Sequence, residues 1–156
     1  MSDDLERAEI GGGRAGGAAA EPPRARVLIV DDQAQSRRVC AGYCDLFDHV
    51  SETAKSGAEA VAAMKRAAFD VVVMSVHMEG GQALETVRQI RALPDPAGQA
   101  PIVGLTAIGR GDEAQRWLAA GLAGVLAKPV SAARLHAALA AALSGFDASE
   151  RSWAPS

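Results

Sequence analysis

Short apolar runs rich in valine and isoleucine alternate along this chain with longer segments of helical periodicity. The run at 69–74, FDVVVM, is the strongest, and its continuous apolar character indicates a strand buried on both faces. Similar runs occur at 26–31, 101–105 and 124–127, and a weaker one at 49–54. Five strands that alternate with helices predict an α/β fold, a doubly wound five-stranded parallel sheet with helices on both faces.

The segments between these strands carry apolar residues at the spacing of helix faces. In the first segment, Val39, Tyr43, Leu46 and Phe47 mark the face that we expect to pack on the sheet. The other predicted helices are marked by Val61, Met64 and Ala68 within 59–68; by Leu84, Val87 and Ile90; by the segment 112–120, ended by Gly121; and by Leu135, Leu139 and Leu143, with Ser131 as N-cap.

Length and composition predict how the chain is organised. Its 156 residues suit one domain, and an apolar content of 49% is enough to form a core. Residues 1–25 are rich in glycine, alanine and proline, which predicts a flexible, disordered arm; a role as tether or docking tail stays open. Residues 145–156 are predicted to form a short flexible tail, which leaves 26–144 as the folded domain.

Charge and hydropathy argue against several classes of protein. The formal net charge of −3 lacks the basic excess of a general nucleic-acid binder. No uncharged apolar run approaches the roughly 18 residues that cross a bilayer, and the first residues lack the features of a signal peptide. Two cysteines suit a reducing compartment. We expect a cytoplasmic protein that binds neither nucleic acid nor membrane.

Polar residues close four of the five predicted strands. Asp31 and Asp32 follow the first strand, Ser75 the third, Thr106 the fourth and Lys128 the fifth. The carboxyl ends of parallel strands meet at one edge of the sheet, and ligands of such folds bind beyond that edge. The sequence therefore predicts a site there.

With these residues the chain resembles the receiver domains of bacterial two-component response regulators, over about residues 26–144. Four motifs carry the resemblance: VLIVDD at 27–32, FDVVVMSVHM at 69–78, IVGLTA at 102–107 and AKP at 127–129. The resemblance implies the flavodoxin-like strand order 2-1-3-4-5. It also implies phosphoryl transfer from a kinase histidine to an aspartate that closes the third strand, beside an acid pair that helps to hold Mg²⁺.

Residue by residue, the resemblance matches Asp31 and Asp32 to the acid pair, and Thr106 and Lys128 to the groups that contact the phosphoryl group. Ser75 stands where the phosphorylated aspartate should be. A serine hydroxyl is neutral near pH 7 and needs a base to become a good nucleophile, and the site loses one anionic metal ligand. We expect a degenerate receiver whose Mg²⁺ site is weak or lost, with no other cofactor, and in which Lys128 pairs with Asp31 or Asp32.

Other positions also depart from the family pattern. Val125 stands where the family usually has an aromatic residue that couples phosphorylation to the output face. Glu79 replaces a usual proline, and Ala83 a usual glycine. Trp117 lies on the fourth predicted helix, whose surface with the fifth strand and helix is the family's usual partner-binding face. The sequence leaves open whether Trp117 is an exposed docking anchor or a core residue.

Simpler interpretations accompany these assignments. Asp31 and Asp32 could cap the first helix, and Lys128-Pro129 could be an ordinary turn, although the family context favours a pocket lysine. A structural hydroxyl is favoured over a phosphorylated serine at Ser75, because no base is evident beside it.

The cysteine residues and the histidines His49 and His136 form no recognisable metal-binding or catalytic motif in the sequence. Cys40 and Cys44 lie four residues apart on the first helix, and we interpret them as small apolar fillers rather than zinc ligands. His49 and His136 are expected at the surface or at its boundary.

Taken together, the sequence predicts a stand-alone, degenerate receiver, not an enzyme, that acts by phosphorylation-independent protein–protein interaction. Its expected partners are a histidine kinase, a phosphotransfer protein or another regulator, and Trp117 and Val125 are the candidate contact residues. One alternative is a receiver that is still phosphorylated, on Asp32 or Ser75, with Mg²⁺. Another is a module that binds a small ligand such as a nucleotide, but the lack of a glycine-rich loop after the first strand counts against it.

Overall fold

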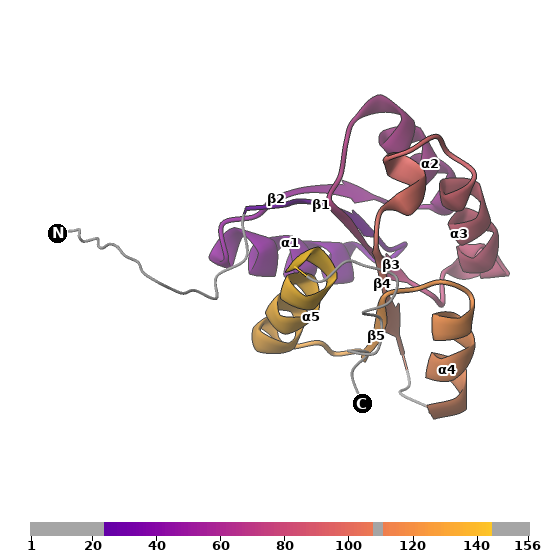
Figure 1. The fold of residues 1–156 in the computed structure, drawn as a ribbon. Helices are drawn as coiled ribbons and strands as arrows, with labels where there is room; N and C mark the ends of the chain where they lie inside the picture. The colour runs from indigo at the N-terminus through magenta and orange to yellow at the C-terminus, as the bar shows by residue number, and fades with distance from the viewer. Residues whose placement is uncertain (1–23, 108–110, 145–156) are drawn as a thin grey trace, which may run out of the picture.

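The computed structural model describes residues 24–107 and 111–144. Strands and helices follow one another in chain order and are joined by short loops (Figure 1). The elements are β1 (Arg26–Val30), α1 (Ala34–Leu46), β2 (Val50–Ala54), α2 (Gly57–Arg66), β3 (Val71–Ser75), the short 3₁₀ turn η2 (Glu79–Gly81), α3 (Ala83–Arg91), the 3₁₀ turn η3 (Ala97–Gln99), β4 (Ile102–Thr106), α4 (Gly111–Ala119), β5 (Gly124–Ala127) and α5 (Ala132–Ser144).

The five strands are all parallel and form one sheet in the order β2-β1-β3-β4-β5. Helices α1 and α5 cover one face of this sheet, and α2, α3 and α4 cover the other (Figure 1). The doubly wound α/β fold and the strand order implied by the resemblance are therefore confirmed. Both β3 and β4 extend far enough to include the polar residues Ser75 and Thr106 that were predicted to follow them.

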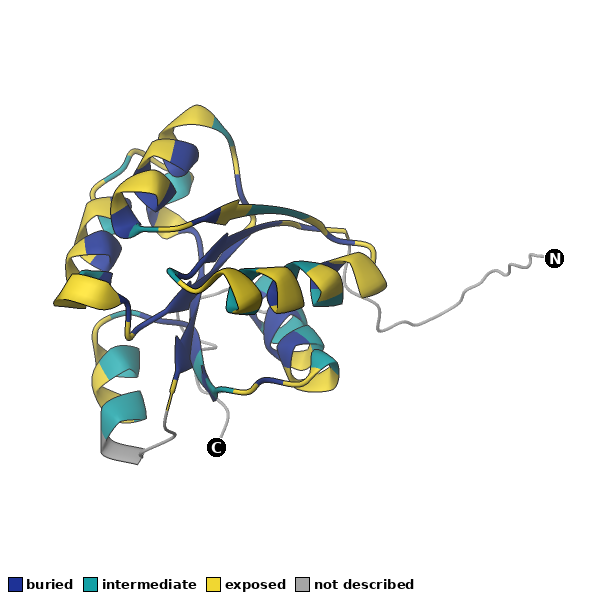
Figure 2. Ribbon diagram, turned by 180° about the vertical axis from the view of Figure 1, so that it is seen from behind, coloured by how far each residue is buried: buried dark blue, intermediate teal, exposed yellow. Residues whose placement is uncertain are grey.

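The alternating side chains of the strands divide the core between the two faces of the sheet. Along β1, Val27 and Ile29 join the cluster under α1 and α5, whereas Leu28 and Val30 join the cluster under α2 and α3. Every residue of β3 is buried, as its continuous apolar run predicted, and Figure 2 shows the central strands as the buried interior of the molecule.

Helix α1 packs on the sheet through a different face from the predicted one. Cys40 and Cys44 are almost fully buried, whereas Val39 is 40% and Leu46 66% exposed. The prediction of a core-facing Val39 and Leu46 is wrong, because the smaller sulfur side chains form the stripe that contacts the sheet. The interpretation of both cysteines as apolar fillers is confirmed. Burial raises the pKa of the Cys40 thiol to about 11 and of Cys44 to about 12, so both are neutral near pH 7.

The other helices largely follow their sequence signals. Ser131 caps α5, since its Oγ accepts a hydrogen bond from the Arg134 N–H at 3.1 Å. Gly121 adopts a φ of +111° just after α4, a left-handed conformation that glycine adopts at low cost at a helix end. On α3, Ile90 is buried as expected, but Leu84 is exposed and does not join the core.

Residues 24 and 25, which composition groups with the N-terminal arm, are attached to the turn before β2. Arg24 Nε donates a hydrogen bond to the Asp48 carbonyl at 3.1 Å, and the Val50 N–H donates to the Ala25 carbonyl at 2.9 Å. The rest of the predicted arm and the predicted tail at 145–156 lie outside the described residues. Among the helices that the structure describes, none is long and apolar enough to span a bilayer.

His49 is buried, with only 4% of its surface exposed, so the expectation of a surface or boundary position is wrong for it. The reason is a specific contact: its Nδ1 accepts a hydrogen bond from the Ala25 N–H at 3.1 Å. A hydrogen bond of this kind offsets part of the free-energy cost of removing an imidazole from water. His136 lies half-buried on α5, as a boundary residue does.

Gly104, in the middle of β4, provides a test of how tightly this core is packed. An added Cβ there would lie 2.7 Å from Leu122 Cδ2 and 3.0 Å from Val76 Cγ1. We predict that Gly104→Ala lowers the free energy of unfolding by about 1–3 kcal/mol, because neighbouring side chains must shift. The measurement is urea denaturation followed by circular dichroism.

The matched control is Gly42→Ala on α1, where an added Cβ meets nothing within 4 Å. It should raise the free energy of unfolding by about 0.5–1 kcal/mol, since alanine is the better helix former. Equal effects of the two substitutions would contradict the packing of β4 described above.

Candidate functional site

The predicted site residues meet at the carboxyl edge of the sheet. Ser75 pairs in register with Leu105 between β3 and β4, and Thr106 pairs with Ala127 between β4 and β5. The Lys128 N–H donates to the Thr106 carbonyl at 2.7 Å, which fixes the start of the loop after β5. The strand ends thus bring together polar groups that lie far apart in the sequence.

Asp31 and Lys128 form a buried ion pair across this edge. Asp31 is fully buried, and the Lys128 Nζ lies 2.8 Å from its Oδ2 while 21% of the lysine side chain remains exposed. The other carboxylate oxygen, Oδ1, accepts a hydrogen bond from the Gln33 N–H at 3.0 Å. The sequence left two carboxylates open as the partner of Lys128, and the partner is Asp31. Each oxygen of Asp31 therefore already accepts one hydrogen bond from within the chain.

Asp32, the second acid, is held by the segment that follows β3. Its Oδ2 accepts a hydrogen bond from the Glu79 N–H at 2.7 Å. Glu79 stands where the family usually has proline, which has no N–H to donate. This departure from the family pattern therefore supplies a hydrogen bond that the usual residue could not make, and it occupies an oxygen of the acid pair.

Ser75 and Thr106 are buried hydroxyl residues at the ends of neighbouring strands. Within the described part of the chain the Thr106 Oγ1 is enclosed and has no hydrogen-bond partner. The histidine two residues along, His77, contacts Glu113 of α4 through its Nε2 at 2.8 Å. No hydrogen bond joins His77 to Ser75 within the described residues, so this histidine is not placed as a base for the Ser75 hydroxyl.

The Mg²⁺ that the resemblance implies does not fit these donors well. Mg²⁺ prefers several oxygen ligands in near-octahedral geometry, commonly including carboxylates. Here Asp31 is paired with Lys128, Asp32 accepts the Glu79 amide, and the third position carries the neutral hydroxyl of Ser75. Across residues 24–107 and 111–144 no cluster of three acidic, histidine or cysteine side chains could hold a metal ion.

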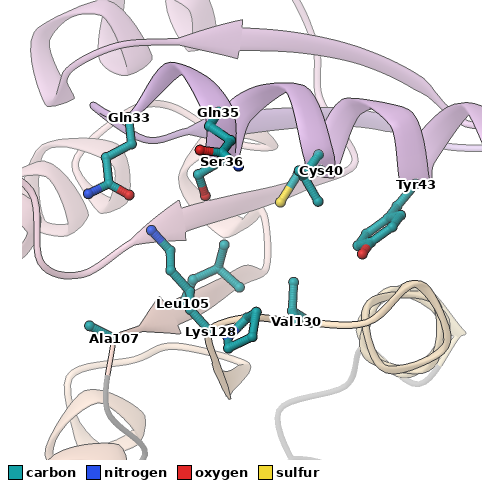
Figure 3. A pocket seen from close by; sticks show the side chains of 11 residues that line it. Gln33, Gln35, Ser36, Cys40, Tyr43, Leu105, Ala107, Lys128 and Val130 are labelled. Atoms are coloured by element: carbon teal, nitrogen blue, oxygen red, sulfur yellow. The ribbon is translucent and has the colours of Figure 1, made fainter.

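A pocket of about 500 Å³ lies beside the ion pair, between α1 and the loop that joins β5 to α5 (Figure 3). Figure 3 shows Gln33, Ser36 and Cys40 from the start and middle of α1 on one side, with Lys128 and Val130 opposite. The raised pKa of the Cys40 thiol, caused by burial, excludes a ready nucleophile from this lining. Sequence reasoning missed the pocket, because it forms only where α1 and the loop after β5 come together in the folded chain.

Trp117 and Val125 lie at the side of the sheet covered by α4. Both are half-buried and pack against the core cluster under α2 and α3. Trp117 also lines a second pocket, of about 380 Å³, together with Leu84 of α3 and Arg116 of α4. Part of the indole thus packs on the core and part of it lines an open groove, and its role as a docking anchor stays a prediction.

Helix α1 provides an apolar surface that the sequence analysis assigned to the core. Val39 and Leu46 are exposed on α1, and Val50 is exposed at the start of the edge strand β2. Tyr43 lies between the first two on the same side of the helix and is half-buried. Figure 2 shows exposed residues along the outer side of α1. The sequence already contained an indication of this surface. Helix α1 has two adjoining apolar stripes, Val39, Tyr43 and Leu46 in one and Cys40 and Cys44 in the other, and only one of them can face the sheet.

Comparison with known proteins places these residues in a wider context. A family model described as the response regulator receiver domain matches residues 27–140. The sensor histidine kinase AruS of Pseudomonas aeruginosa is 34% identical over 126 residues, which cover 77% of this chain but 13% of that protein. The transcriptional regulatory protein ResD of Bacillus subtilis is 34% identical over 91 residues, 58% of this chain and 35% of that protein.

A solved structure agrees with these matches. The chemotaxis protein CheY4 of Vibrio cholerae superimposes with a TM-score of 0.70 at 30% sequence identity, covering 78% of this chain and 100% of that one. The chain thus spans a small part of the curated relatives AruS and ResD, and the whole of a compact structural relative.

Removing the Lys128 ammonium group should leave the buried Asp31 carboxylate without its counter-charge. We predict that Lys128→Met lowers the free energy of unfolding by about 3 kcal/mol, because Asp31 keeps its burial and loses its counter-charge. Urea denaturation at pH 7 measures the change.

The double variant Asp31→Asn/Lys128→Met is the control, since the asparagine Oδ1 can still accept the Gln33 amide hydrogen bond. It should recover roughly half or more of the loss, as neither charge remains. If the double variant is less stable than Lys128→Met, the ion pair is not the reason for the effect.

Proposed function

The chain belongs to the response regulator receiver family, and from this premise we propose that it is a degenerate receiver that acts by protein contact without aspartyl phosphorylation. Receiver domains are signalling modules of two-component systems, where they interact with histidine kinases and other signalling proteins, and they are generally not enzymes. The proposal concerns how this member works.

The observation that carries the proposal is Ser75 at the end of β3. This position lies at the carboxyl edge of the sheet, beside Thr106 and near the Asp31–Lys128 pair. It is where the resemblance places the phosphorylated aspartate, yet it has a hydroxyl group that needs a base. His77, the nearest histidine in the sequence, contacts Glu113 of α4 and makes no hydrogen bond to Ser75 within the described residues. The groups present therefore disfavour transfer of a phosphoryl group to this position.

Two further contacts support a closed site. Lys128 already neutralises Asp31, and the Glu79 amide already occupies an oxygen of Asp32. An incoming Mg²⁺ would have to compete with the Lys128 Nζ and the Glu79 N–H for these carboxylates. We therefore propose that Asp31, Asp32, Thr106 and Lys128 now serve mainly to hold the strand ends together, with Mg²⁺ binding weak or lost.

For the contact itself we propose the outer side of α1. Val39 and Leu46 are large, apolar and exposed there, with the half-buried Tyr43 between them on the same side of the helix. Exposed apolar side chains that cluster in this way are typical of protein-binding surfaces. The second candidate surface is the groove beside Trp117. Trp117 and Val125 of β5 are the contact residues that the sequence predicts.

The proposed partners are a histidine kinase, a phosphotransfer protein or another regulator. We further propose that the receiver works as a separate module in the cytoplasm, whose reducing conditions suit the free thiols of Cys40 and Cys44. The size of the protein in extracts of its source cell, measured by immunoblot, checks whether it carries an output domain.

One observation favours the alternative of a receiver that is still phosphorylated. Thr106 keeps an enclosed hydroxyl without a partner in the described residues, at the same edge as Lys128. These are two of the groups that the family uses on the phosphoryl group. In this alternative Asp32 or Ser75 accepts the phosphoryl group with Mg²⁺, and the experiment below decides between the two.

Incubation with Mg²⁺ and acetyl phosphate tests the closed site. We predict that the wild-type protein gains no mass of a phosphoryl group and shows no saturable Mg²⁺ shifts in the amide signals of residues 31, 75, 106 and 128. We predict that Ser75→Asp/Glu79→Pro gains both, because it restores the third carboxylate and removes the amide that holds Asp32. Met78 is already extended, as a residue before proline must be.

The controls are Ser75→Asn/Glu79→Pro, which has the size of the carboxylate but not its charge, and Ser75→Asp alone. The first should bind no Mg²⁺, and the second should bind it more weakly than the double variant. A stable phosphoryl adduct on the wild-type protein would instead support the phosphorylated alternative, and peptide mapping would show whether Asp32 or Ser75 carries it.

Phosphorylation-independent contact predicts a particular pattern of affinities. Against purified phosphotransfer domains of candidate histidine kinases, Ser75→Ala should keep the wild-type Kd, whereas Leu46→Glu should weaken binding about tenfold or more. Isothermal titration calorimetry measures both values. Lys65→Glu, exposed on α2 at the other face of the sheet, is the control for an added negative charge.

Arg116→Glu reports on the second candidate surface, because Arg116 is exposed beside Trp117 on α4. Loss of affinity with Arg116→Glu but not with Leu46→Glu would move the contact to the Trp117 groove. A change of affinity with Ser75→Ala of the same size as with Leu46→Glu would count against phosphorylation-independent binding.

A further inference from the structure

The buried His49 has its nitrogens in a defined arrangement. Its Nδ1 accepts a hydrogen bond from the Ala25 N–H at 3.1 Å, so this nitrogen carries no proton. The proton of the neutral imidazole is therefore on Nε2. The Nε2 is enclosed and has no hydrogen-bond partner among residues 24–107 and 111–144. The only position left for a second proton on this ring is the nitrogen that already accepts from Ala25.

The Ala25–His49 contact belongs to the attachment of the chain before β1. The Ala25 carbonyl accepts from the Val50 N–H at 2.9 Å, and the Arg24 Nε donates to the Asp48 carbonyl at 3.1 Å. These bonds join residues 24–25 to residues 48–50. They lie at the amino ends of β1 and β2, the opposite edge of the sheet from the Asp31–Lys128 pair.

A second imidazole faces the same region from α5. The ring of His136 stacks on Phe47, with centroids 4.0 Å apart and an angle of 17° between planes. Its Nδ1 is enclosed and, within the described residues, also lacks a hydrogen-bond partner. His136 also lies near enough to His49 that a positive charge on one imidazole opposes a positive charge on the other.

The charged groups around His49 do little to favour its protonation. From the turn before β2, Asp48 favours the charged form, while the His136 imidazole opposes it. From α1, Cys44 stays neutral, because burial raises its thiol pKa to about 12, and Asp45 is exposed to solvent. From the segment before β1, Arg24 adds a positive charge.

We propose that His49 is a pH-sensitive contact that fastens the start of β1 and releases it on acidification. A proton from solvent binds Nδ1, the Ala25 N–H loses its acceptor, and two N–H donors then face each other. The segment 24–25 must move away from the turn at 48–50 for the imidazolium to be accommodated. Mild acid thereby loosens the amino edge of the sheet while the Asp31–Lys128 edge stays intact.

The direction with pH follows from burial. Desolvation first, and the neighbouring His136 second, lower the pKa of His49 below its ordinary value of 6.5. The neutral form therefore contributes stability that is fully present above pH 6.5. This stability is lost as the pH falls below 6.5 and through the lowered pKa of the folded state.

Nuclear magnetic resonance on the whole chain tests the proposal, because three histidines give only three imidazoles to follow. We expect the Nε2–H tautomer for His49 at pH 7.5 and a titration midpoint below 6.5. We also expect the exchange protection of the Ala25 and Val50 amides, corrected for intrinsic rates, to fall about tenfold or more by pH 5. An Nδ1–H tautomer, or a midpoint at or above 6.5, would overturn the proposal.

Two variants separate this contact from general acid sensitivity. His49→Asn keeps a side-chain oxygen close to the place of Nδ1 but cannot titrate, so the protection of Ala25 should change less than about twofold over the same pH range. His77→Gln removes an exposed histidine and should keep the wild-type pH dependence. If His77→Gln abolishes the pH dependence, or His49→Asn leaves it unchanged, His49 is not the group responsible. Should His49→Asn fail to fold, the tautomer and midpoint of the wild-type protein still decide.

Discussion

A fully buried carboxylate at the end of β1 needs a positive partner, and this requirement organises the carboxyl edge of the sheet. Lys128 meets it from the loop after β5, which is separated from β1 by the two strands β3 and β4, with an Nζ–Oδ2 distance of 2.8 Å. The pair ties together strand ends that are 97 positions apart in the sequence. Since an unpaired buried charge costs several kcal/mol, the loop after β5 has little freedom to take another position. The nearby pocket under α1 takes its shape from this constraint.

The departures from the family pattern act on the same few atoms. Ser75 removes a carboxylate, Glu79 supplies an amide that bonds Asp32, and Lys128 is left to neutralise Asp31. In the closed site that we propose, each of the first two changes disfavours a metal ion or a phosphoryl group, and the acid pair has partners inside the chain. The receiver scaffold keeps its core and its topology. In the proposed mode of action by contact, function depends on the surfaces of α1 and α4.

Much of the fold was predictable, because strand periodicity and continuous apolar runs depend on local sequence. The buried run of β3 and the polar residues at the strand ends were found from the sequence, and the family resemblance supplied the strand order. The errors came where one helix had two possible faces. On α1, Val39 and Leu46 are larger and more apolar than the stripe of Cys40 and Cys44, yet the smaller stripe packs on the sheet. His49 was misplaced because its burial depends on the Ala25 amide, 24 residues earlier.

Residue type and spacing along each segment were enough to predict the element types and the residues that close the strands, because these properties are local. The family resemblance then identified Ser75 as the residue at the phosphoacceptor position. The pairing of Lys128 with Asp31 rather than Asp32, the hydrogen bond from the Glu79 amide to Asp32 and the burial of His49 near His136 became known from the folded structure alone. Those outcomes depend on distances between segments far apart in the chain, and such distances arise only when the sheet assembles and the helices pack upon it.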